Sequence, residues 1–178
     1  MKVILLGYMA SGKTSIGKKL AKRLNLTFID LDDYISLQEK LSVTVIFKKK
    51  GEIYFRKKET HYLKELLESN QNFILALGGG TPCYGDNLKI INSYTTSFYL
   101  KRSLNDTYSK LSKFKNKNKR PLIASIANDD LKEFIAKHLF ERAPFYEQAT
   151  HTIIIEAKTK KEIVKEIGAI VIKNLSST

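Results

Sequence analysis

Residues 7–14 read GYMASGKT and match the pattern G-x-x-x-x-G-K-[ST] in full. In such a loop the glycines let backbone N–H groups point at phosphate oxygens, and the helix that follows adds the positive end of its dipole. The pattern predicts that Lys13 bridges the β- and γ-phosphates of ATP and that the Thr14 hydroxyl binds Mg²⁺. The predicted ATP-binding residues of this loop are Gly7, Ala10, Ser11, Gly12, Lys13, Thr14 and Ser15.

Two carboxylates follow the second apolar run, in the segment FIDLDD at 28–33. Alternate residues of a strand share a face, so Asp30 and Asp32 are expected to point into one crevice beyond the strand ends. One carboxylate there can hold Mg²⁺, and the other can accept a proton from an acceptor hydroxyl. An aspartate at this place can instead cap the next helix, which is the role we expect for Asp33.

Arginines and a run of glycines form the third set of candidates. Arg56 taken alone reads as a surface residue that pairs with Glu59 three positions on. The run Gly78–Gly80 follows an apolar segment, and three glycines expose N–H groups and allow a ligand to approach closely. Arg120 and Arg142 each stand beside a proline-containing motif, and arginine can bind a carboxylate through two parallel hydrogen bonds.

Short apolar runs alternate with segments of helical periodicity along the chain. This alternation predicts βαβ units, and therefore an α/β fold with a parallel sheet covered by helices on both faces. The phosphate loop lies between the first expected strand and the first expected helix, where its chemistry requires it. The expected strands are 2–6, 26–31, 73–77, 96–100 and 151–155, and the clearest expected helices are 14–24, 52–69, 131–146 and 160–173.

Composition narrows the class of protein. The chain has 178 residues, 43% of them hydrophobic and 28% charged, which suits one globular domain. Cys83 is the only cysteine, so an intrachain disulfide is excluded and a reducing compartment is favoured. No apolar run reaches the length of a membrane span or a secretory segment. We therefore expect a soluble, cytoplasmic protein without a membrane partner.

The net charge is +13, from 31 basic and 18 acidic residues. A basic surface can bind nucleic acid or attract anionic small molecules, and it can also reflect a general bias of composition. The segment 112–119, SKFKNKNK, is polar and is expected to form a mobile surface loop. Phe114 is its only aromatic residue, which argues against stacking on nucleic-acid bases.

The ordered set of motifs resembles the shikimate kinase family over nearly the whole chain. The matching stretches are GYMASGKTSIGKKLA, FIDLDD, GE…FR..E, LGGGTP, KRPL and ERAPFY. The resemblance implies a single domain, 1–178, with a three-layer P-loop fold, a five-stranded parallel sheet and a mobile lid at about 110–124. It also implies ATP-dependent phosphorylation of the 3-hydroxyl of shikimate, a step in the synthesis of chorismate and the aromatic amino acids.

The resemblance assigns roles residue by residue. Asp32 would engage the reacting hydroxyl, Asp30 and Thr14 would serve Mg²⁺, and Lys13 and Arg120 would act on the phosphates. Glu59 would orient Arg56, and Lys110 would lie near the adenine. The residues implied to bind shikimate are Asp32, Arg56, Gly78, Gly79, Gly80 and Arg142.

The chain departs from the family pattern at two positions: Ala10 replaces a usual glycine, with little expected effect, and Ser36 stands where glutamate is common. A gluconate kinase of similar fold would explain the phosphate loop but not two arginines with three glycines. A P-loop ATPase acting on RNA or DNA would make use of the positive charge. We expect shikimate and ATP as the partners of a monomer, and no nucleic acid.

Overall fold

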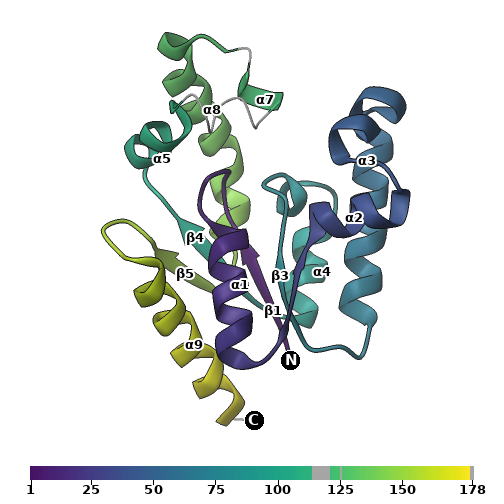
Figure 1. Ribbon diagram of the computed structural model, residues 1–178, viewed down its shortest axis with the longest axis vertical. Helices are drawn as coiled ribbons and strands as arrows, with labels where there is room; N and C mark the ends of the chain where they lie inside the picture. The colour runs from purple at the N-terminus through teal and green to yellow at the C-terminus, as the bar shows by residue number, and fades with distance from the viewer. Residues whose placement is uncertain (114–120, 125, 177–178) are drawn as a thin grey trace.

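The computed structural model describes residues 1–113, 121–124 and 126–176. Its strands form one five-stranded sheet in the order β2-β3-β1-β4-β5, and every neighbouring pair is parallel (Figure 1). The predicted α/β class and parallel sheet are thereby confirmed. The strands are β1 (Lys2–Leu6), β2 (Thr27–Asp30), β3 (Phe73–Ala76), β4 (Thr96–Lys101) and β5 (His151–Ile154).

Helices cover both faces of the sheet (Figure 1). The helices α1 (Lys13–Leu24) and α9 (Lys160–Ser176) pack on one face, where Val3 and Leu5 of β1 join their apolar side chains. Ile4 and Leu6 point to the other face and join the larger apolar cluster. Alternate residues of the same strand thus feed two separate cores. The elements that contribute to the larger cluster include α2 (Leu31–Glu39), α3 (Val43–Glu68), α4 (Asn87–Tyr94) and α8 (Asn128–Tyr146).

The strand order brings two loops together at the carboxyl edge of the sheet. Strand β1 lies between β3 and β4, with Leu5 level with Ala76 of β3. The chain leaves β1 toward α1 on one face and leaves β3 toward α4 on the other. In open α/β sheets, such divergence marks the place where a ligand crevice forms beyond the strand ends. The phosphate loop after β1 and the glycine run after β3 meet at this edge, because a Cβ on Gly79 would lie 3.7 Å from the Gly7 carbonyl oxygen.

Two local features differ from the sequence expectations. The helices α4 and α5 (Leu104–Leu111) were not anticipated, although Leu88 and Ile91 give α4 a buried face. Strand β2 stops at Asp30, and Leu31 already belongs to α2. Helix α8 ends at Tyr146 as expected and contains Pro144 near its end. Among the described residues, no helix is both long and apolar enough to cross a membrane.

The predicted lid at about 110–124 falls only partly within the described residues. The structure describes its beginning, at the end of α5, and the short helix α7 (Pro121–Ala124). Residues 114–120 lie outside the described part, and they include Lys115, Lys117, Lys119 and Arg120. The lid and the role of Arg120 therefore stay predictions.

Candidate functional site

The phosphate loop joins β1 to α1 and has the backbone of an anion-binding turn. Gly12 caps the start of α1 with φ 92° and ψ 15°, a left-handed conformation that favours glycine. The Nζ of Lys13 donates to the carbonyl oxygens of Gly7 at 2.7 Å and Tyr8 at 3.1 Å. Ser11 is buried. The hydroxyl of Ser15 donates to the Gly12 carbonyl oxygen. The Lys13 side chain thus folds back across the phosphate loop.

Ala10 has a φ of 63°, in the left-handed region. An L-residue there costs about 1–2 kcal/mol of strain relative to a right-handed conformation. Alanine in place of the usual glycine thus adds backbone strain but leaves the motif intact, because the fixed glycines of the motif are Gly7 and Gly12. A glycine at position 10 would adopt the same conformation without that strain.

The predicted Mg²⁺ residues lie next to each other. The Thr14 hydroxyl donates to Oδ2 of Asp30 at 2.8 Å, which joins the first turn of α1 to the end of β2. The other oxygen of Asp30 accepts from the Asp32 amide at 3.3 Å and caps α2. Asp30 therefore has the capping role that we expected for Asp33, in addition to its position beside Thr14.

Asp32 enters the crevice by a different route from the one expected. It lies in the first turn of α2, not on β2, so strand alternation does not bring it near Asp30. Burial, followed by the negative charges of Asp30 and Glu59, raises the pKa of its carboxyl from 3.8 to about 6. The positive charges of Lys13 and Arg56 act in the opposite direction. Asp32 is therefore a carboxylate at neutral pH that binds a proton readily.

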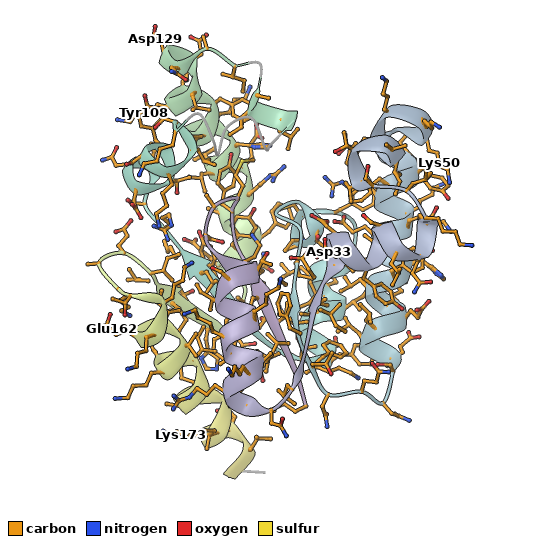
Figure 2. The ribbon with its side chains drawn as sticks, in the orientation of Figure 1. Asp33, Lys50, Tyr108, Asp129, Glu162 and Lys173 are labelled. Atoms are coloured by element: carbon orange, nitrogen blue, oxygen red, sulfur yellow. The ribbon has the colours of Figure 1, made fainter. Side chains whose placement is uncertain are left out.

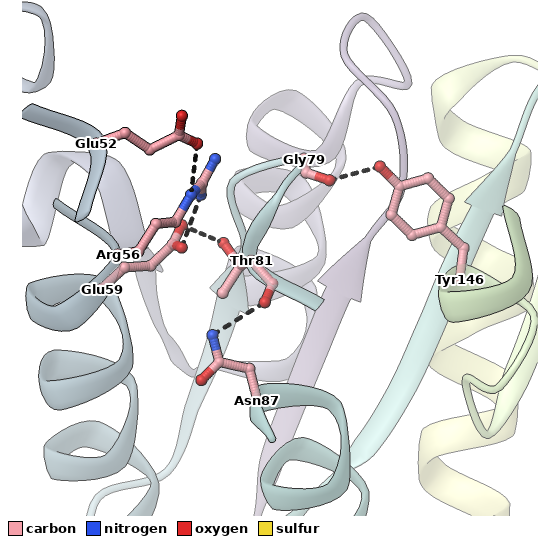
Figure 3. Close-up of polar contacts among 7 residues, drawn as sticks. All are labelled: Glu52, Arg56, Glu59, Gly79, Thr81, Asn87 and Tyr146. Atoms are coloured by element: carbon pink, nitrogen blue, oxygen red, sulfur yellow. Dashed lines mark hydrogen bonds and ion pairs between the residues drawn. The ribbon is translucent and has the colours of Figure 1, made fainter. Parts of the chain in front are cut away.

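Arg56 is held against the glycine run by a buried glutamate (Figure 3). Its Nη1 donates to Oε2 of Glu59 at 2.8 Å, and the Thr81 hydroxyl donates to Oε1 of Glu59 at 2.6 Å. The expected pairing of Arg56 with Glu59 is confirmed, but Glu59 is 0% exposed, so the pair does not lie on an open helix face as expected. A Cβ at Gly80 would lie 2.7 Å from Nη2 of Arg56. A side chain at position 80 would therefore force the Arg56 guanidinium to shift.

Arg142 approaches the same glycine run from α8. A Cβ placed on Gly79 would lie 3.6 Å from Nη1 of Arg142 and 3.7 Å from the Tyr146 hydroxyl. That hydroxyl donates to the Gly79 carbonyl at 2.5 Å (Figure 3). Burial raises the pKa of Tyr146, so its phenol stays a hydrogen-bond donor. Two arginines from opposite sides of the crevice thus meet at Gly79 and Gly80.

Several residues of the site carried no individual prediction. Tyr146 and Thr81 hold the glycine run, and only their places in the motifs ERAPFY and LGGGTP marked them. The Tyr8 hydroxyl lies 3.1 Å from Nδ1 of His138 and so joins the phosphate loop to α8. Burial raises the pKa of Tyr8 to about 12, whereas burial and then Arg142 lower the pKa of His138. The spacing of residues 8 and 138 in the sequence does not predict this contact.

Lys110 lies in the last turn of α5. Burial lowers its pKa, and the positive charges of Arg102, Lys160 and Lys113 lower it further. The Lys110 ammonium group therefore lies near other cations, and an anionic ligand would reduce the repulsion between them. Its predicted place near adenine stays a prediction.

Comparisons with known proteins agree with this geometry. Residues 9–171 match the family model for shikimate kinase. A shikimate kinase from Flavobacterium psychrophilum is 51% identical over 172 residues, which cover 95% of this chain and 98% of the relative.

Solved structures give the same result. A shikimate kinase from Bacteroides thetaiotaomicron superposes with a TM-score of 0.87 at 32% identity, covering 96% of this chain and 98% of that one. A shikimate kinase from Acinetobacter baumannii, solved in complex with shikimate, gives 0.85 at 28% identity, covering 97% and 93%. The P-loop fold, the family and the kinase class expected from the motifs are confirmed. The chain belongs to the shikimate kinase family.

Proposed function

We propose that this protein transfers the γ-phosphate of ATP to the 3-hydroxyl of shikimate and forms shikimate 3-phosphate and ADP. The observation that carries the proposal is the meeting of Arg56 and Arg142 at the glycine run, on the same crevice as Asp32. Two guanidinium groups suit a carboxylate, and a carboxylate base suits a hydroxyl. Shikimate carries both groups on one ring.

The chemical roles follow from the charges. Asp32 accepts the proton of the 3-hydroxyl, and the hydroxyl oxygen forms a bond to the γ-phosphorus. The bond between that phosphorus and the β-γ bridging oxygen breaks, and ADP leaves with the electron pair. Lys13 and the loop amides stabilise the negative charge that develops on the phosphates. Because the pKa of Asp32 is about 6, its carboxylate form predominates at neutral pH and the rate falls below that pH.

Mg²⁺ fits the oxygen atoms beside the phosphate loop. Thr14 and Asp30 supply a hydroxyl and a carboxylate 2.8 Å apart, and Mg²⁺ prefers such oxygen ligands. The described residues contain no cluster of three or more histidine, cysteine or acidic side chains suited to a metal. That pattern suits an ion held mostly by nucleotide phosphates and water. When bound, Mg²⁺ neutralises phosphate charge during the transfer.

The remaining assignments complete the proposal. Arg120 would reach the phosphates and Lys110 the adenine, within a lid at about 110–124 that closes over ATP and shikimate. The chain would act as a single domain, 1–178, and as a cytoplasmic monomer. The excess of positive charge would attract the anionic substrates.

An acceptor panel tests the proposal. Purified protein with ATP and Mg²⁺ is given shikimate, gluconate or RNA, and ADP release is followed in each case. We expect release only with shikimate, in a one-to-one ratio to shikimate consumed. Release that depends on gluconate or RNA, with none on shikimate, would overturn the proposal.

A further inference from the structure

Glu39, at the end of α2, accepts hydrogen bonds or ion pairs from four side chains of α3. The hydroxyl groups of Tyr54 and Tyr62 donate to it at 2.6 and 2.9 Å. The ammonium groups of Lys58 and Lys50 lie 3.1 and 3.3 Å from its oxygens. The Glu39 side chain is only 7% exposed. We call these five residues the Glu39 cluster.

Glu39 stays a carboxylate at all ordinary pH values. Hydrogen bonds, first from Tyr54 and then from Tyr62 and the two lysines, lower the pKa of Glu39 to about 2. Lys50 also lies 4.4 Å from the centre of the Tyr54 ring. Exposed ion pairs contribute little, but a shielded carboxylate with four donors holds its partners in one geometry. The Glu39 cluster therefore holds α2 against α3 and does not act as a pH switch.

The Glu39 cluster spans a break in α3. Gly51 has φ 81° and ψ 170°, outside helical geometry, and a Cβ there would meet no heavy atom within 4 Å. The space on the side where a Cβ would lie is thus open at this glycine. Glu39 contacts Lys50 before the break and Tyr54 after it. Asp33 and Lys50 mark the two joined helices on one side of the molecule in Figure 2.

The same two helices carry both groups assigned to the acceptor. Asp32 lies in the first turn of α2, and Glu39 ends that helix. Arg56 stands between Tyr54 and Lys58 in sequence, but its hydrogen bonds go to Glu52 and Glu59, which do not belong to the cluster. One face of α3 therefore fixes the helix to α2, while another presents the guanidinium to the crevice.

We propose that Glu39 is a positioning residue of the acceptor site, which sets the distance between Asp32 and Arg56 by joining α2 to both parts of α3. The inference rests on the proposed function, because it takes these two side chains as the groups that bind the acceptor. Glu39 itself touches no substrate.

The test compares Glu39→Ala and Glu39→Gln with the control Glu166→Gln. Glu166 loses an ion pair of 2.7 Å with Lys158, on the surface of the molecule. A misplacement of about 1 Å costs roughly 10²-fold in rate, so we expect Glu39→Ala to lower kcat/KM for shikimate about ten- to a hundredfold. KM for ATP should stay unchanged. Glu39→Gln keeps an oxygen for the tyrosines and should be impaired less, and Glu166→Gln should match the wild type.

The comparison of KM for shikimate with KM for ATP decides whether Glu39 acts on the acceptor site. A general loss of folding would affect both substrates alike. It would raise both KM values, or it would lower the amount of active enzyme and leave both KM values unchanged. An unchanged kcat/KM for shikimate, or equal increases in both KM values, would overturn the proposal.

A second measurement keeps the inference separate from the proposed function. Shikimate binding to the wild-type protein is measured by calorimetry without ATP, and failure to bind counts against the function alone. Amide hydrogen exchange in 31–39 and 50–62 then tests the Glu39 cluster. We expect faster exchange in both segments for Glu39→Ala than for Glu166→Gln. Equal exchange in the two variants would overturn the positioning role whatever the substrate is.

Discussion

Replacing Asp32 with asparagine should make the free protein more stable and nearly inactive. The carboxyl has a pKa of about 6 in the folded chain, against an ordinary value of 3.8, mainly because burial disfavours its charge. Between these two values the folded chain binds a proton that the unfolded chain does not. The free energy of unfolding therefore falls as pH rises through this window, and it stays lower at neutral pH. Asparagine has nearly the same shape without the charge.

The size of the effect follows from the two pKa values. A difference of about two pKa units, at 1.36 kcal/mol each, corresponds to about 3 kcal/mol. The positive end of the α2 dipole favours a carboxylate in the first turn by about 0.3–1 kcal/mol, which asparagine loses. The net gain should be about 2 kcal/mol. For a chain of this size that raises Tm by about 4–8 °C.

Thermal unfolding at a series of pH values measures this gain. The advantage of Asp32→Asn should be full at neutral pH and should disappear near pH 4, where the wild-type carboxyl is protonated. Asp33→Asn changes an exposed carboxylate in the same turn and serves as the control. In parallel, kcat of Asp32→Asn should fall about 10²-fold or more. A variant of equal or lower Tm at neutral pH, or a gain that persists near pH 4, would refute the reasoning.

Four further substitutions test other parts of the site. Lys13→Met should abolish turnover and leave the fold intact, because the lysine serves phosphate charge and not the core; normal turnover of a folded variant would contradict the phosphate-loop assignment. Arg142→Lys should raise KM for shikimate far more than KM for ATP, since lysine lacks the planar fork; equal KM values for wild type and variant would remove Arg142 from the acceptor site. Gly80→Ala should raise KM for shikimate because a Cβ would lie 2.7 Å from the Arg56 guanidinium, and unaltered kinetics would argue against that contact. Ala10→Gly should raise the free energy of unfolding by about 1 kcal/mol, because relief of left-handed strain exceeds the added backbone entropy, and a loss of stability would contradict this.

Local pattern was enough to predict the sheet and the phosphate loop. The strand β1 is an apolar run that ends at a complete phosphate-loop motif, and both signals lie within about a dozen residues. Motif order was also enough to nominate Asp32, Arg56 and Arg142, whose side chains the fold brings to the glycine run. Their route into the site was less predictable: Asp32 was expected on a strand, because FIDLDD alternates, but Asp30 caps a helix that begins one residue later.

Contacts between distant segments could not be predicted from the pattern. Thr81 reaches Glu59 across 22 positions, Tyr146 reaches Gly79 across 67, and Tyr8 reaches His138 across 130. Each depends on how α3 and α8 pack beside the glycine run, which no local periodicity encodes. The same holds for Glu39, which has no motif of its own and receives its partners only once α2 and α3 meet.

The central claim concerns which oxygen receives the phosphate. The direct measurement is the product spectrum after incubation of the protein with ATP, Mg²⁺ and shikimate, read by phosphorus and proton nuclear magnetic resonance. The account predicts one product, with the phosphorus coupled to the proton at carbon 3, formed by the wild-type protein and nearly absent with Asp32→Asn. Phosphate on another hydroxyl, or undiminished product with Asp32→Asn, would contradict it.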